Sequence, residues 1–114
     1  MRVEYINPFV ESAIQILKET VSEDVKRGQL SLKSAISPML GVVVIVGLAG
    51  QVSGRVIFDM DRATALKVAS KMNDEELTEF DELTTATLTE LANMITGKAV
   101  TKLQELGFQF DLTP

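Results

Sequence analysis

A long helical pattern of apolar residues between Glu79 and Leu106 constrains the fold of this 114-residue chain more than any other feature. Apolar side chains recur there at spacings of three and four residues, which places them on one stripe of an α-helix. The pattern therefore predicts a long helix, beginning near Thr78, with one face in the core. The predicted buried stripe consists of Phe80, Leu83, Leu88, Leu91, Ala92, Ile95, Ala99, Leu103 and Leu106.

The opposite stripe of the same predicted helix holds Ala86, Glu90, Asn93 and Gly97. Glu90 and Asn93 stand one turn apart, so their side chains are neighbours on the helix surface. Ala86 and Gly97 are among the smallest residues and flank the pair along the axis. The sequence thus predicts a carboxylate and a carboxamide that project from a low, flat surface on which a second protein could lie. The spacing by itself also fits two solvated residues on an ordinary surface helix.

Composition excludes several classes of function. The chain has no cysteine and no histidine, which removes thiol nucleophiles, histidine bases, disulfides and the usual zinc ligands. Its net charge is −5 and its basic residues are not clustered, which argues against nucleic acid as a partner. The apolar run 39–49 contains about eleven residues, whereas a membrane span needs roughly 18 or more. We expect a cytoplasmic domain without membrane insertion.

Shorter patterns predict two further helices and four strands. The first helix is predicted over 8–27, with Asn7 as N-cap and Pro8 at the first helical position. The second is predicted over 62–72, capped by Asp61, and Thr78 resembles the start of a capping box for the long helix. Gly97 is predicted to kink the long helix or to end its first segment, and Gly107 to cap its end. Strands are predicted over 29–36, 41–49, 52–59 and 108–112.

The order of these elements predicts the α+β class, with helices on one face of a largely antiparallel sheet. The strand over 41–49 is apolar on both faces, so we expect it to be central or covered on both sides. The strand over 108–112 ends the chain soon after it starts, which resembles an interrupted sheet. Since long apolar edges are normally paired or covered, we expect a homodimer that forms through the sheet edges.

Several motifs carry a resemblance to a known family. The segment Phe80-Asp81-Glu82-Leu83, then Glu90-Leu91-Ala92-Asn93-Met94 and Gly97-Lys98, resembles the CheC/CheX/FliY family of chemotaxis phosphatases, and most closely its CheX branch. Two differences stand out. Ala86 occupies a position where the family pattern often has Asp or Ser, and family members usually continue through further strands after Thr113-Pro114. We therefore expect a single CheX-like domain over 1–114 that lacks the family's C-terminal strands.

The resemblance implies a function and a set of site residues. The implied substrate is the aspartyl-phosphate of a phosphorylated receiver domain, such as that of CheY. Asn93 is the implied group that positions the attacking water, and Glu90 is the implied partner of the receiver's active-site lysine. Ala86 and Gly97 are expected to contact the partner. We expect this chain to bind no cofactor and the receiver to supply Mg²⁺. A non-catalytic adaptor that binds receivers is the alternative.

Overall fold

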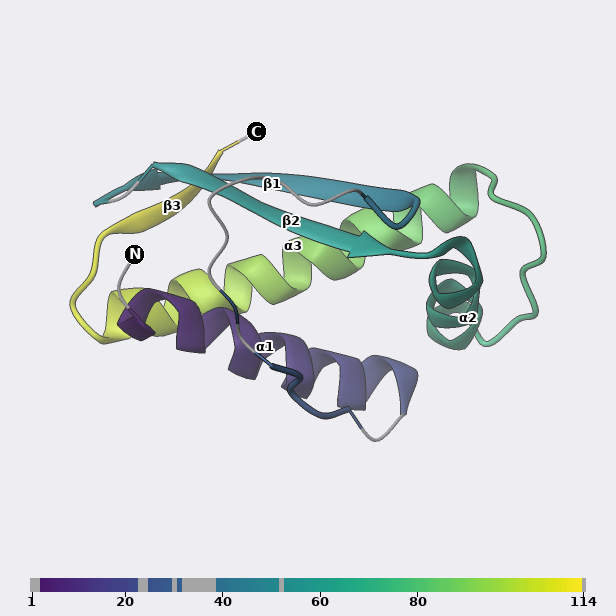
Figure 1. Cartoon of the computed structure of the whole chain (residues 1–114), viewed down its shortest axis with the longest axis horizontal. Helices are drawn as coiled ribbons and strands as arrows, with labels where there is room; N and C mark the ends of the chain where they lie inside the picture. The colour runs from purple at the N-terminus through teal and green to yellow at the C-terminus, as the bar shows by residue number, and fades with distance from the viewer. Residues whose placement is uncertain (1–2, 23–24, 30, 32–38, 52, 114) are drawn as a thin grey trace.

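Three helices and three strands make up the described part of the chain, whose computed structural model covers residues 3–22, 25–29, 31, 39–51 and 53–113. In chain order these elements are α1 (Val3–Val21), β1 (Val42–Gly50), β2 (Gly54–Met60), α2 (Arg62–Asn73), α3 (Glu82–Glu105) and β3 (Phe110–Thr113). The strands form an antiparallel sheet in the order β2-β1-β3, and α1 and α3 lie antiparallel to each other along one face (Figure 1). The predicted α+β class, with helices on one face of an antiparallel sheet, is confirmed.

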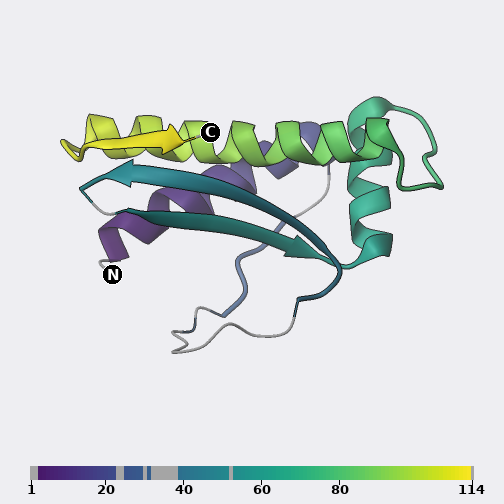
Figure 2. The same ribbon diagram turned by 90° about the horizontal axis from the view of Figure 1, so that it is seen from above.

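β1 is the central strand, as its apolar sequence predicts. Val42 and Val44 pack on the helices together with Phe58 of β2, which lies opposite Val44 in the sheet. The side chain of Ile45 points to the other face and is 52% exposed. The helices therefore cover only one face of the described sheet, as seen from above in Figure 2.

Two glycines of β1 allow the last strand to come close. A Cβ atom added at Gly47 would overlap the hydroxyl of Thr113, and one added at Gly50 would overlap the carbonyl oxygen of Gln109. Gly50 also has a φ of +129°, which favours glycine. These contacts support the interpretation of both residues as sheet and turn geometry rather than as part of a phosphate-binding loop.

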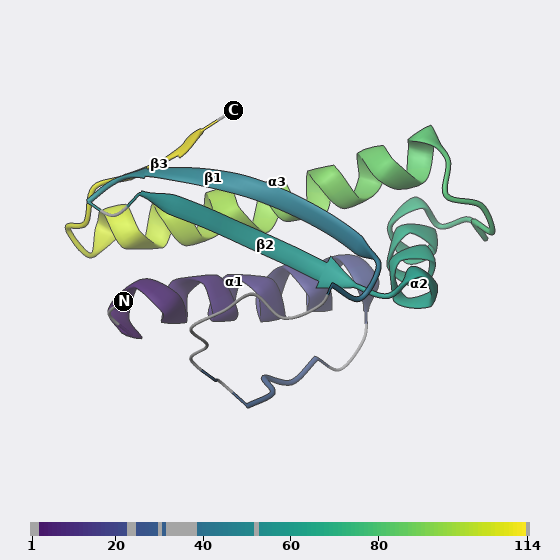
Figure 3. The same cartoon turned by 45° about the horizontal axis from the view of Figure 1, so that its top comes forward.

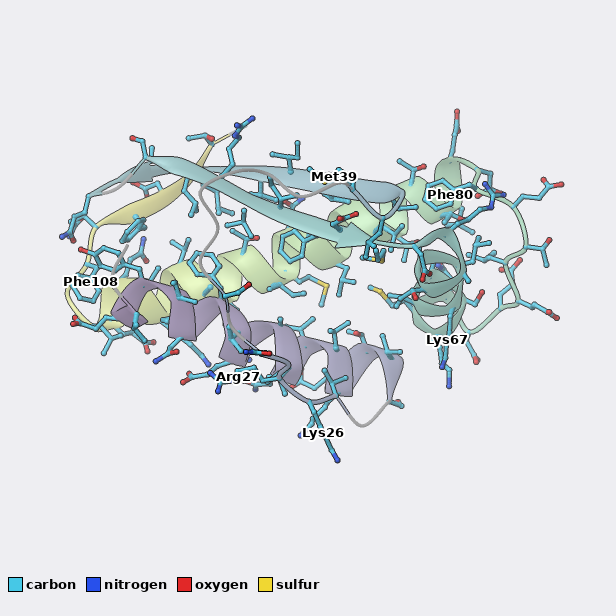
Figure 4. All side chains as sticks on the ribbon, viewed as in Figure 1. Lys26, Arg27, Met39, Lys67, Phe80 and Phe108 are labelled. Carbon is cyan, nitrogen blue, oxygen red and sulfur yellow. The ribbon has the colours of Figure 1, made fainter. Side chains whose placement is uncertain are left out.

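The core consists of two clusters that share α3. The larger cluster lies between α1, α2 and α3, with Ile16, Val21, Ala65, Val68, Leu88, Leu91 and Ile95 as its buried members. The smaller one joins Tyr5 to Val100, Leu103 and Phe110. The Tyr5 ring meets the rings of Phe108 and Phe110 edge-on, at centroid distances of 4.9 and 5.2 Å. Figure 4 shows Phe108 close to the start of α1.

The first helix differs from the prediction at both ends. It begins at Val3 instead of Pro8, so Pro8 lies inside the helix and Asn7 is not its N-cap. Burial of Tyr5 explains the extra turn at the start of the helix. The contacts of its ring offset the loss of the hydrogen bond that Pro8 cannot donate. The helix ends at Val21, and not at Arg27, because Ser22 adopts a left-handed conformation with a φ of 58°.

The strand predicted over 29–36 falls largely on residues outside the described ranges. Its described members, Gln29 and Ser31, lie in no helix or strand. No helix in the described ranges is long and apolar enough to cross a lipid bilayer.

α2 lies at the end of the sheet where β2 finishes and runs steeply across the direction of α3 (Figure 3). Asp61 is its N-cap, as predicted, and accepts a 2.7 Å hydrogen bond from the Thr64 N–H. This backbone hydrogen bond lowers the pKa of the Asp61 carboxyl below its ordinary value of 3.8. At the same end of the molecule, the Arg62 guanidinium lies 5.9 Å from the centre of the Phe80 ring, which Figure 4 labels.

The long helix starts four residues later than predicted. Its N-cap is Asp81, whose side chain accepts a 3.0 Å hydrogen bond from the Thr84 N–H. The Thr84 backbone bond also lowers the pKa of the Asp81 carboxyl. The capping box predicted at Thr78 is therefore wrong, because Asp81 supplies the acceptor that the first turn needs.

α3 continues through Gly97 to Glu105, so the predicted end of a first helical segment at this glycine is wrong. The alternative, a kink at Gly97, stays a prediction. Gly107 caps the end of the helix as predicted and has a φ of +93°. Its N–H donates to the Gln104 carbonyl, and the Phe108 N–H donates to the Leu103 carbonyl. Because Phe108 takes part in this cap, β3 begins at Phe110, two residues later than predicted.

Candidate functional site

The inner face of α3 fixes the orientation of the whole helix. Its buried residues are Thr84, Leu88, Leu91, Ala92, Ile95, Thr96, Ala99, Val100 and Leu103. Most of the predicted apolar stripe is therefore in the core. Leu83 and Leu106 are exceptions, with 43% and 63% of their surface exposed, and their predicted burial is wrong.

Two threonines and Val100 occupy buried positions that the apolar pattern did not include. Thr84 and Thr96 are fully buried because their hydroxyl groups find acceptors within the fold. The Thr84 hydroxyl donates to the Glu79 carbonyl at 3.0 Å, and that of Thr96 donates to the Ala92 carbonyl at 2.7 Å. A search for apolar periodicity does not detect such residues, since their burial depends on hydrogen bonds.

The opposite face of α3 presents the predicted site residues to the surface. Ala86, Glu90 and Asn93 are exposed, and Gly97 is partly exposed. We call these four residues the α3 stripe. Within the described part of the chain, neither Glu90 nor Asn93 forms a hydrogen bond or ion pair. Their polar atoms are therefore available to a partner.

Small residues on both sides of the polar pair leave the α3 stripe without long side chains at these positions. Ala86 contributes only a methyl group. A Cβ atom added at Gly97 would meet no other atom within 4 Å. Packing within the described chain thus gives no reason for a glycine here, although glycine in a helix interior costs about 1 kcal/mol relative to alanine.

The backbone that carries the polar pair is held firmly by the core. Leu91, Ala92 and Ile95 belong to the same turns as Glu90 and Asn93, and only 1–3% of their surface is exposed. The two polar side chains therefore project from a helix whose other side cannot shift without disturbing the core. Such a support preorganises a site for a partner.

The α3 stripe lies on a convex helix surface. Cavities of about 650 and 570 Å³ lie elsewhere, beside Lys102 at the end of α3 and beside Tyr5 between α1 and the sheet. Among the described residues, no group of three or more carboxylates could hold a metal ion, and the chain has neither histidine nor cysteine. The stripe is therefore shaped for contact with a macromolecule rather than for enclosing a small substrate.

The fold and the stripe define a class of protein: an α+β domain that offers a carboxylate and a carboxamide on the exposed face of a long helix. The family described as "Chemotaxis phosphatase CheX" matches residues 42–114. The chain belongs to this family of chemotaxis phosphatases. The resemblance seen in the sequence, including its preference for the CheX branch, is confirmed.

Individual relatives are similar to this chain over nearly its whole length. The CheY-P phosphatase CheX of Thermotoga maritima is 32% identical over 115 residues, which cover 100% of this chain and 74% of that protein. The crystal structure of the CheX-CheY-BeF3-Mg²⁺ complex from Borrelia burgdorferi contains a chain with 46% identity and a TM-score of 0.84, covering 99% of this chain and 75% of that one. CheX from Vibrio vulnificus has 31% identity and a TM-score of 0.86, covering 96% and 74%.

Proposed function

We propose that this chain hydrolyses the aspartyl-phosphate of a CheY-like receiver domain, with the α3 stripe lying across the receiver's phosphorylation site. The observation that carries the proposal is the exposure of Glu90 and Asn93, one turn apart and without partners in the described chain. Membership of the CheX family supports it, as does the similarity to a chain from a CheX–CheY complex.

Asn93 is the proposed catalytic residue. Its carboxamide oxygen accepts a hydrogen bond from the attacking water, and its NH₂ group donates to a phosphoryl oxygen. The water oxygen forms a bond to phosphorus as the bond from phosphorus to the aspartate oxygen breaks, which yields inorganic phosphate and the free carboxylate. An acyl phosphate is already activated, so positioning the water is the main task. In favourable systems positioning contributes roughly 7–11 kcal/mol.

Glu90 has the proposed role of docking and orienting the receiver. Its carboxylate pairs with the lysine of the receiver's active site, which aligns α3 so that Asn93 faces the phosphoryl group. The receiver supplies Mg²⁺, and this chain supplies the helix that approaches the site. A charged pair that loses water at the interface fixes the register of the two proteins.

Ala86 and Gly97 are the proposed contact points on either side of the polar pair. The methyl group of Ala86 and the lack of a side chain at Gly97 let the receiver's backbone come close to α3, so that a carboxamide on a short stem can reach the phosphoryl group. Ala86 also makes this chain differ from the family pattern, in which Asp or Ser is frequent. That difference favours a second candidate function, a receiver-binding adaptor with no hydrolysis.

Release of phosphate distinguishes the two candidate functions. The probe is Borrelia burgdorferi CheY, phosphorylated in the presence of Mg²⁺ by a small-molecule phosphodonor and then freed of the donor. A phosphatase accelerates the loss of the phosphoryl group at substoichiometric amounts of the chain. An adaptor binds the same receiver but leaves the rate of loss unchanged.

We also propose that two copies of this chain associate through the open edge of β1, which we define as residues Val42–Val46. Within the described ranges, these residues pair with β2 on one side, and β3 pairs only with Gly47–Gly50 on the other. Unpaired strand edges are templates for further strands.

A cytoplasmic location is proposed as well, since an absence of cysteine fits a reducing compartment.

A further inference from the structure

Leu83 lies exposed at the N-terminal end of the face that carries Glu90 and Asn93. A single exposed leucine is ordinary on a protein surface, so exposure alone indicates nothing. Its position is what distinguishes it. Leu83 precedes Glu90 by seven residues, which corresponds to about 20° around the helix and about 10.5 Å along it. Leu83, Ala86, Glu90 and Asn93 therefore follow one another on one side of α3.

The fold explains why Leu83 points outward, away from the core. The cap at Asp81 and the hydrogen bond from the Thr84 hydroxyl to the Glu79 carbonyl hold Thr84 in a fully buried position. Its neighbour Leu83 is then turned about 100° away from that direction. Leu83 belongs to neither core cluster, although other partly buried apolar residues pack against them. A polar helix-forming residue at this position would therefore disturb neither cluster of the described core.

We infer that Leu83 is an apolar anchor for the receiver domain, adding a second contact to the docking face two turns before Glu90. This inference rests on the proposed function, because the receiver is its occupant. Ala86 lies between Leu83 and Glu90 and leaves the surface low, so one partner can touch both residues at once. The contact is made in the bound ground state and does not change as phosphate leaves. Leu83 therefore affects affinity, and not the rate of the chemical step.

The test compares Leu83→Gln with wild-type chain and with Leu106→Gln. Glutamine is a good helix former of similar length, so it removes the apolar contact and preserves the helix. Leu106 is the matched control, since it is also exposed but stands at the C-cap of α3, away from the stripe. Binding is measured by titration with Borrelia burgdorferi CheY loaded with Mg²⁺ and beryllofluoride, which stands in for the phosphoryl group. Kinetics of phosphate release give KM and kcat.

Leu83→Gln is expected to raise both Kd and KM about tenfold, with kcat within about twofold of wild type. Leu83→Met should restore binding because it returns an apolar side chain, and Leu106→Gln should bind like wild type. Equal affinity of Leu83→Gln and wild type overturns the inference, and so does a fall in kcat at constant KM. If Leu83→Gln is unfolded, Leu83→Ala is judged by the same outcomes. A wild-type chain that does not bind the receiver at all contradicts the proposed function instead.

Discussion

Glu90 and Asn93 stand one turn apart on α3 but are proposed to act at different stages of the reaction. In the proposed mechanism, Glu90 meets the receiver's lysine when the complex forms, whereas Asn93 matters mainly when water attacks phosphorus. An interaction present in the ground state changes affinity, and one confined to the transition state changes turnover. Substitutions at these two residues therefore separate the two roles.

Glu90→Ala is expected to weaken binding of the beryllofluoride-loaded receiver and to lower turnover as well. Removing one partner of a desolvated interfacial ion pair typically costs about 2–5 kcal/mol, because the other charge is left unpaired. Titration of the receiver measures the change in Kd. Glu19→Ala, on the exposed side of α1, is the control for loss of one surface carboxylate. An unchanged Kd for Glu90→Ala would contradict the docking role proposed for Glu90.

Gly97 gives a second prediction at the level of single residues. Gly97→Ala is expected to raise the free energy of unfolding by about 0.5–1 kcal/mol, because alanine favours a helix and its Cβ would meet no other atom. Gly97→Leu should also fold, but its side chain should block the receiver and abolish binding. Denaturant unfolding measures the stability of Gly97→Ala, and titration with the receiver measures binding by Gly97→Leu. Wild-type affinity in Gly97→Leu would show that the receiver does not approach this part of α3.

At the scale of elements, the N-termini of α2 and α3 depend on two carboxylates, Asp61 and Asp81. Backbone N–H groups of Thr64 and Thr84 donate to them and lower the pKa of each below 3.8. A pKa that is lower in the folded state means that the carboxylate stabilises the fold fully above the unfolded value. This contribution is lost as the pH falls through the folded pKa.

The two caps predict how stability depends on pH. The double variant Asp61→Asn with Asp81→Asn should resemble wild type at neutral pH, because asparagine also accepts a hydrogen bond at an N-cap. As the pH falls below about 4 it should lose less stability than wild type, since asparagine does not titrate there. Denaturant unfolding at several pH values measures the difference. Parallel pH profiles for the two proteins would contradict the role of the caps.

At the scale of the whole molecule, the open edge of β1 predicts a dimer. Light scattering should give a mass near twice the 12.5 kDa of the chain. Ile45→Lys should yield single chains, since Ile45 is an exposed residue of the open edge and lysine there disfavours strand pairing. Ile57→Lys distinguishes this edge from the other unpaired edge of the described sheet, because Ile57 lies opposite Ile45 on the edge strand β2. It should leave the dimer intact. A wild-type protein that stays a single chain at high concentration would contradict the proposal.

The sequence predicts the structure correctly where one physical effect dominates. Periodicity orients α3 correctly, because its apolar residues are numerous enough to decide which face is buried. It therefore also places Glu90 and Asn93 on the exposed side. Asp61 and Gly107 act as predicted, since a cap and a left-handed turn depend on neighbouring residues alone.

The errors arise where distant or polar contacts decide the outcome. The extra first turn of α1 depends on Tyr5 meeting rings more than a hundred residues further along the chain. Hydrogen bonds of Thr84 turn that residue inward and Leu83 outward, which apolar periodicity does not register. The apolar anchor that we propose at Leu83 is not predicted by the sequence pattern for this reason.

Turnover by Asn93→Ala tests the central claim most directly. This variant should release phosphate from phosphorylated CheY no faster than the receiver does alone, while its Kd for the beryllofluoride-loaded receiver stays within about twofold of wild type. Gln15→Ala, which removes an exposed carboxamide from α1, should keep full activity. If Asn93→Ala instead hydrolyses the phosphoryl group at the wild-type rate, Asn93 does not position the water and the proposed mechanism is wrong.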